Sequence, residues 1–113
     1  MTRSHVTTHV LDAIAGTPAV GVGVTLSVSR DDGWLAVASG VTDADGRVAS
    51  LGPERLGPGI YQVRFDVGAY FERAGRETFY PTVEIAFTLA HPDEHYHVPL
   101  LLSPFAYSTY RGS

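Results

Sequence analysis

The sequence contains no cysteine, which excludes a disulfide framework and a thiolate zinc site and is compatible with a reducing cytosol. It has no apolar run approaching the roughly 20 residues of a membrane helix. Its first residues, "MTRSHVTTHVLDAIAG", lack the apolar core and small-residue cleavage site of a signal peptide. Basic side chains are scattered singly and form no stripe of the kind that nucleic acid requires. We therefore expect no membrane or nucleic-acid partner and a cytoplasmic location.

What the chain does have is the composition of an ordinary globular protein, with 113 residues, 44% hydrophobic residues, 18% charged residues and a net charge of −4. A chain of this length has room for one hydrophobic core. No internal repeat or linker divides it. The sequence therefore predicts a single domain over residues 1–113.

Alternation of apolar and polar residues is the dominant pattern. It is clearest over residues 22–28, where valine and leucine occupy every second position, and it returns over residues 61–67 and 83–89. Such alternation is typical of strands with one buried face. Further strands, with turn sequences between them, are predicted at residues 6–11, 34–41, 96–102 and 107–111.

One short helix is predicted over residues 69–74, where Gly75 supplies a left-handed cap. Its length makes it an accessory and not a structural layer. Seven or eight short strands with frequent turns favour an all-β sandwich.

Histidine is the side chain best suited to proton transfer near neutral pH, and the chain has five. Because side chains alternate across a strand, His5, Thr7 and His9 share one face of the first strand. Val6 and Val10 share the other face. His9 therefore need not belong to the core, although a histidine taken alone is more often a surface or interface residue than a catalytic one.

The segment "HYHVPLLL" places His95 and His97 on one strand face together with Pro99. The opposite and more apolar face, which we expect to pack in the sandwich, carries Tyr96, Val98, Leu100 and Leu102. Two histidines on one strand face suit zinc or copper. The chain offers no third ligand at a recognisable spacing, so we expect no metal site.

Arg47 follows the turn in "TDADGR", where a guanidinium can present paired donors to a carbonyl or an anion. From the residues alone, an exposed arginine accounted for by Asp43 and Asp45 is the better interpretation. The serines near the end show no nucleophile-elbow pattern, which argues against a serine hydrolase. The final segment, "SPFAYSTYRGS", holds three aromatic residues and an arginine. We expect this tail to dock, which can serve the fold, a subunit contact or catalysis.

Three segments, in order and at matching intervals, resemble the transthyretin-like 5-hydroxyisourate hydrolase family: "TTHVLDAIAGTPAVGVGVTL", "VTDADGR" and "HYHVPLLLSPFAYSTYRGS". The last of them ends on the Tyr-Arg-Gly-Ser signature, residues 110–113, that separates the enzymes from transthyretin itself. The resemblance implies an all-β, prealbumin-like (transthyretin-like) sandwich of two four-stranded sheets with one short helix. It also implies a homotetramer, built as a dimer of dimers, with active sites in the groove where the dimers meet.

The resemblance implies a reaction as well. Enzymes of this family hydrolyse 5-hydroxyisourate, the product of urate oxidation, to 2-oxo-4-hydroxy-4-carboxy-5-ureidoimidazoline on the way to allantoin. They open an amide of the six-membered ring and use neither a cofactor nor a metal.

Carried over residue by residue, the family's site falls on His9, Arg47, His97, Tyr110 and Ser113. The resemblance gives one histidine the role of proton acceptor for water, and gives the other the role of orienting water or protonating the leaving nitrogen. Arg47 would hold substrate oxygens, Tyr110 would bind the flat ring, and Ser113 would offer its hydroxyl or the terminal carboxylate. Which histidine is the base stays open.

The remaining histidines, His5, His91 and His95, are not carried over and are interpreted as structural or surface residues. Two rival functions are a transthyretin-like carrier, which would hold a small aromatic ligand in the channel of a tetramer, and a purely structural adhesion-type sandwich. The tail favours the enzyme, because a carrier has no need of the two site histidines, Arg47 and the intact signature together.

Overall fold

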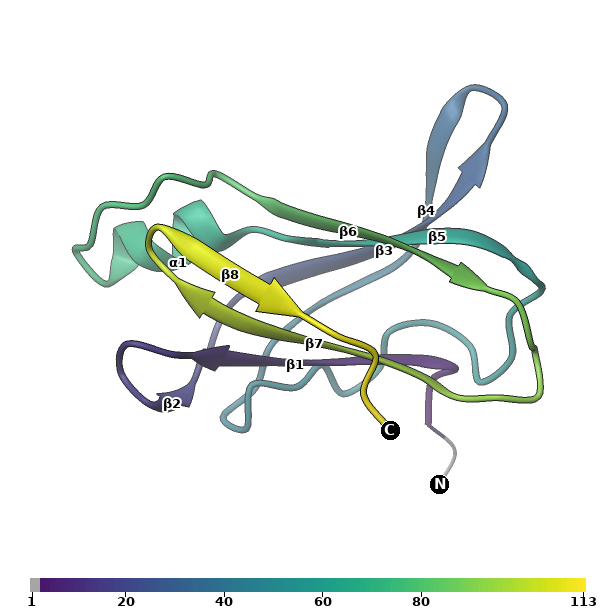
Figure 1. Ribbon diagram of the computed structural model, residues 1–113, viewed down its shortest axis with the longest axis horizontal. Coiled ribbons are helices and arrows are strands. Elements are labelled where there is room, and N and C mark those ends of the chain that lie inside the picture. The colour runs from purple at the N-terminus through teal and green to yellow at the C-terminus, as the bar shows by residue number, and fades with distance from the viewer. Residues whose placement is uncertain (1–2) are drawn as a thin grey trace.

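A computed structural model of the protein describes residues 3–113, and they form two four-stranded sheets that face each other (Figure 1). The first sheet has the order β2-β1-β7-β8 and the second has the order β4-β3-β5-β6. The strands of the first sheet are β1 (Val6–Asp12), β2 (Thr17–Pro18), β7 (Tyr96–Ser103) and β8 (Ala106–Thr109). The second sheet and the helix after β5 comprise β3 (Gly23–Arg30), β4 (Gly33–Val41), β5 (Gly59–Phe65), α1 (Val67–Arg73) and β6 (Val83–Leu89). The predicted sandwich of two four-stranded sheets with one short helix is confirmed.

Strands β1 and β7 pair in parallel, whereas the other neighbours in both sheets are antiparallel. The register of this parallel pair sets Thr7 opposite His97 and His9 opposite Pro99. Segments about 90 positions apart in the chain thereby become neighbours. This pairing carries most of the geometry of the candidate site.

The core lies between the sheets and follows the predicted alternation. In β1 every second residue is buried, beginning with Val6, while Thr7 and His9 are only partly covered on the other face. The faces predicted for β7 are also confirmed, because the apolar set that begins at Tyr96 is buried and His97 lies partly covered on the outer face. Burying one such large aliphatic side chain contributes roughly 1.5–3 kcal/mol.

The helix and the terminal strand depart from their predicted bounds. Residues 61–67 were expected to form one strand, but β5 ends at Phe65 and α1 begins at Val67. Val67 and Phe71 are both buried, one helical turn apart, so the apolar residue that continues the strand alternation also starts the helical face. Gly75 has a φ of 68° and confirms the predicted left-handed cap.

At the C-terminus, β8 spans Ala106–Thr109 and not residues 107–111, because Thr109 is the last residue that pairs with the edge of β7. The short strand β2 was not predicted. It is a two-residue ladder with β1, too brief to show any alternation. Within the described residues, no helix is long and apolar enough to cross a membrane.

A buried carboxylate ties the helix region to β1. Asp12 is fully buried and accepts hydrogen bonds from the Tyr70 hydroxyl at 2.7 Å, from Arg76 and from the Ala15 amide at 3.0 Å. Burial raises the pKa of the Asp12 carboxyl, but these donors outweigh it and leave the pKa lowered. Burial and the bond to Asp12 raise the pKa of Tyr70 to about 12. The shifts in pKa therefore favour the ionised form of Asp12 and the neutral form of Tyr70 near neutral pH.

Candidate active site

The outer face of the first sheet brings together residues from β1, β7, the turn after β4 and the C-terminal tail. His9 forms an isolated antiparallel bridge with Arg47, and His97 forms one with Gly112. Between these bridges, β1 and β7 pair directly. Arg47 and the tail therefore flank the two histidine-bearing strands from opposite sides.

The turn that carries Arg47 is folded by its own acidic residue and held against β1. The Asp43 carboxylate accepts from the backbone amides of Asp45 at 2.9 Å and Arg47 at 3.1 Å. Gly46, at a φ of 75°, accepts at its carbonyl from the Val10 amide at 2.8 Å. A Cβ at Gly46 would lie 2.4 Å from the Val10 carbonyl oxygen, so only glycine permits this approach.

The Arg47 side chain is exposed and, within residues 3–113, forms no ion pair with a carboxylate. The interpretation that Asp43 and Asp45 account for its charge is wrong, because Asp43 binds the Arg47 backbone instead. The guanidinium therefore keeps its donors for a ligand.

His97 is held at one ring nitrogen and packed by the tail. Its Nδ1 lies 2.8 Å from the Thr7 hydroxyl, which leaves Nε2 as the nitrogen available to a ligand. The Gly112 amide donates to the His97 carbonyl at 2.9 Å. A Cβ at Gly112 would stand 2.5 Å from the Cδ2 atom of the ring, so the glycine of the tail is required by this close approach.

The electrostatics of the site favour the neutral form of His97. Burial lowers the pKa of His97, and the positive charge of Arg47 lowers it further. A neutral imidazole that stands near an unpaired guanidinium can accept a proton while the guanidinium holds negative charge.

His95 was predicted to be a structural or surface residue, yet it lies beside His97 and contacts the same threonine. Its Nε2 is 2.8 Å from the same Thr7 hydroxyl that contacts His97. Burial lowers the pKa of His95, as does the nearby positive charge of Arg3. Sequence reasoning missed Thr7 and His95 as neighbours of the site, although their parity already placed each on the outer face of its strand.

The other two histidines outside the predicted site do not contact it. His5 is buried, with its ring bound to the Glu94 carbonyl at 2.7 Å and the Leu56 amide at 2.8 Å, which confirms a structural role. His91 is exposed in the loop before β7.

The tail is docked, as predicted, and Arg111 fastens it. Arg111 donates to the Glu94 carboxylate at 3.0 Å and to the His95 carbonyl at 3.1 Å, and its guanidinium lies 4.3 Å from the ring centroid of Tyr96. Tyr110 remains 60% exposed, and Ser113 is exposed at the chain end. Docking therefore positions the last residues beside His97 without burying them.

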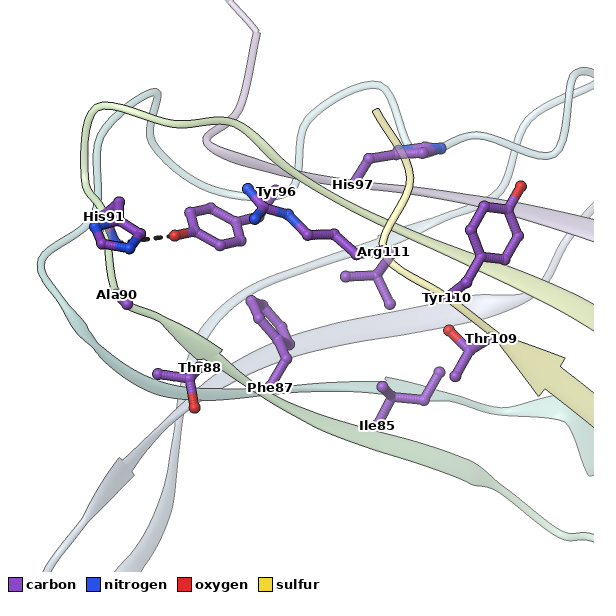
Figure 2. A pocket seen from close by; sticks show the side chains of 11 residues that line it. Ile85, Phe87, Thr88, Ala90, His91, Tyr96, His97, Thr109, Tyr110 and Arg111 are labelled. Atoms are coloured by element: carbon purple, nitrogen blue, oxygen red, sulfur yellow. Dashed lines mark hydrogen bonds between the residues drawn. The ribbon is translucent and has the colours of Figure 1, made fainter.

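A cavity of about 470 Å³ opens nearby, between β6 and the strand β7 with the tail (Figure 2). Ile85 and Phe87 of β6 line one side, and His97, Tyr110 and Arg111 lie on the other. The remaining predicted site residues, His9, Arg47 and Ser113, do not line it. His9, Arg47 and His97 thus come from neighbouring segments of the first sheet, whereas Tyr110 lies with His97 at the cavity.

Within residues 3–113, no three His, Asp or Glu side chains form a group able to hold a metal ion. His95 and His97, the pair considered from the sequence, both direct a ring nitrogen at Thr7.

Comparison with known proteins identifies the class. Residues 6–112 match the model of the HIUase/Transthyretin family, and the chain belongs to this family. The chain is 49% identical over 106 residues to the 5-hydroxyisourate hydrolase of Salmonella typhimurium. The matched region covers 93% of this chain and 78% of that protein.

Solved structures agree with this membership. The structure of Klebsiella pneumoniae 5-hydroxyisourate hydrolase matches with a TM-score of 0.85 and 40% identity over the full length of both chains. Sea bream transthyretin in complex with thyroxine matches with a TM-score of 0.88 and 40% identity, over 95% of this chain and 93% of that one. The fold is therefore shared by an enzyme and by a protein that binds a small aromatic ligand.

Proposed function

We propose that this protein hydrolyses 5-hydroxyisourate to 2-oxo-4-hydroxy-4-carboxy-5-ureidoimidazoline in the degradation of urate to allantoin. The observation that carries the proposal is the outer sheet face, where His9, an exposed Arg47 and His97, whose pKa is lowered, meet beside the docked tail. The names of the similar hydrolases support the same substrate.

The reaction adds water to a ring amide carbonyl and breaks the carbon–nitrogen bond. One histidine accepts a proton from the attacking water, and the ring nitrogen takes up a proton as it leaves. Arg47 holds substrate oxygens and stabilises the negative charge that develops on the carbonyl oxygen. Tyr110 binds the flat ring, and Ser113 contributes its hydroxyl or the terminal carboxylate. This chemistry uses no cofactor and no metal.

We further propose that the active protein is a homotetramer, built as a dimer of dimers from single-domain chains of residues 1–113 in the cytoplasm. Large apolar side chains are exposed on the chain, among them Phe79 at 72%, Ile14 at 66% and Phe105 at 64%. Such exposure favours contacts between subunits, and closed symmetric assemblies are the usual outcome for soluble homo-oligomers. Light scattering at assay concentration tests the tetramer; a fully active monomer would contradict a site shared between subunits.

The deciding experiment for function generates 5-hydroxyisourate freshly and follows its ultraviolet decay with and without the protein. We expect acceleration far above the spontaneous rate. An unchanged decay would leave the carrier and the structural sandwich as the remaining functions, and thyroxine-type aromatic ligands would then be tested by titration.

A further inference from the structure

One hydroxyl group connects two histidines at the candidate site. The Thr7 Oγ1 lies 2.8 Å from His95 Nε2 and 2.8 Å from His97 Nδ1. A hydroxyl has a single proton, so it can donate to one ring while it accepts from the other, which forms a chain of hydrogen bonds from His97 through Thr7 to His95. Within this chain, the protonation of one ring nitrogen determines that of the other.

Two arrangements of this chain are possible. In the first, His97 carries its proton on Nδ1 and donates to Thr7, and Thr7 donates to the bare Nε2 of His95. In the second, His95 donates to Thr7 and Thr7 donates to His97, which forces the proton of His97 onto Nε2. Only the first leaves His97 Nε2 free to accept a proton.

The chemistry of a base favours the first arrangement. Once His97 has accepted a proton at Nε2, both of its nitrogens carry hydrogen, and its Nδ1 must donate to Thr7. The first arrangement meets this requirement without any change, whereas the second requires the Thr7 proton to turn toward His95 during the reaction. A pre-arranged donor lowers the reorganisation needed at the moment of proton transfer.

The surrounding charges act in the same direction. Burial and the positive charge of Arg47 disfavour a cationic His97 before substrate binds. Arg47 has donors and no acceptor. Its positive charge therefore favours the tautomer of His97 in which Nε2 presents a lone pair on the outer sheet face. The charged and titratable groups that face the two rings are Arg47, His9, Arg3, His5 and Arg111.

We propose that Thr7 and His95 are positioning residues that hold His97 with its proton on Nδ1 and its Nε2 bare, so that His97 is the general base. The water proton passes to His97 Nε2 as the water oxygen bonds to the carbonyl carbon and the carbonyl π electrons move onto the carbonyl oxygen. The carbon–nitrogen bond then breaks, and the ring nitrogen takes up the proton that the water lost. Throughout, the Nδ1 hydrogen stays bonded to His97 and is donated to Thr7. The role of His97 as base rests on the proposed function, but its tautomer does not.

Two pairs of variants test the chain of hydrogen bonds from His97 through Thr7 to His95. Thr7→Val removes the hydroxyl at nearly constant shape, while Thr7→Ser retains it. His95→Leu removes the acceptor, so the Thr7 proton turns to His97 Nδ1, while the amide oxygen of His95→Gln can still accept. His91→Leu serves as the control, because it removes a histidine from the same loop region that does not contact Thr7.

The direct readout is long-range ¹H–¹⁵N NMR of histidine-labelled protein at about pH 8, above the ordinary pKa of histidine. The His97 signals are assigned from their loss in His97→Gln. We expect an Nδ1–H pattern in wild type, Thr7→Ser, His95→Gln and the control. We expect a shift toward Nε2–H in Thr7→Val and His95→Leu. An Nε2–H pattern in wild type, or one that ignores both disruptive variants, overturns the proposal.

The kinetic readout is the decay assay on the same proteins, with thermal melting to confirm folding. Thr7→Val and His95→Leu should lose on the order of tenfold in kcat with little change in KM, a part of what a general base contributes, and the conservative partners should restore it. A wild-type rate in a variant whose His97 is the Nε2–H tautomer would refute the positioning role of Thr7 and His95. No hydrolysis by wild type, with the expected tautomer present, would refute the proposed function alone.

Discussion

Two arginines that contact β1 have opposite surroundings. Arg76 pairs with the fully buried carboxylate of Asp12, and its side chain is 30% exposed. Arg47 is exposed, and within residues 3–113 it forms no ion pair. A paired and partly buried arginine stabilises the fold, whereas an arginine with spare donors is available to a ligand.

The histidines repeat this contrast. Both ring nitrogens of His5 are bound by backbone groups of Glu94 and Leu56, so its ring has no capacity left for a substrate. His97 bonds to Thr7 through Nδ1, and within residues 3–113 its Nε2 has no hydrogen-bond partner. Unused hydrogen-bonding capacity on an outer face therefore separates the site from the structural clusters.

The largest expected effect comes from removing the tail. Deleting residues 110–113 should lower hydrolysis by more than about a hundredfold, because misplacing a positioning group by about 1 Å already costs roughly that much. The core between the sheets does not include these residues, so circular dichroism should report a folded protein. Full activity in a truncated protein that melts normally would show that the tail takes no part in the site.

The next effect sharpens the contrast between the arginines. Arg47→Lys should lose on the order of a hundredfold in rate, about 3 kcal/mol of transition-state stabilisation, because an ammonium cannot reproduce the planar pair of donors. Its melting temperature should stay near that of the wild type. Arg76→Lys is the matched control and should affect melting more than rate. Near-wild-type kinetics of Arg47→Lys would remove Arg47 from the site.

A smaller effect, on stability alone, is expected from the buried cluster. Asp12→Asn should cost about 2 kcal/mol of unfolding free energy at neutral pH, the scale of hydrogen bonds to a charged group. The pKa of Asp12 in the unfolded chain is about 4, and the pKa in the folded protein is lower. The contribution of the Asp12 carboxylate to the unfolding free energy is therefore complete above about pH 4. It is lost as the pH falls through the folded value. Urea unfolding should therefore show the two proteins converging below about pH 4; a constant difference would contradict the role of the charge.

The smallest expected effect concerns pH and the site charges. The pKa of His97 is lowered by burial and then by Arg47, so its neutral form and its share of stability are complete above the ordinary histidine value. Both are lost as the pH falls through the lower folded pKa. Removing the charge with Arg47→Met should raise the pKa of His97, as an NMR titration would show. A downward shift or none would show that Arg47 does not act on this ring.

Much of the site was predictable because strand parity is a local property. Alternation alone placed His9 and His97 on the outer faces of their strands, and turn residues placed Arg47 just after a tight turn. The interaction of Arg47 with its acidic neighbours was predicted wrongly, since sequence proximity does not reveal whether a carboxylate binds a backbone amide or a side chain. The boundary at residues 65–67 was also wrong, because Val67 fits both periodicities.

The sequence by itself determined which residues face the core and which face outward, because the two-residue repeat of a strand depends only on the strand itself. Only the tertiary structure decided which residues contact one another on that outer face. The parallel register of β1 and β7 placed Thr7 between two histidines, and the docked turn set Arg47 beside His9. These contacts join segments tens of residues apart, and their register is set by the packing of the whole sandwich.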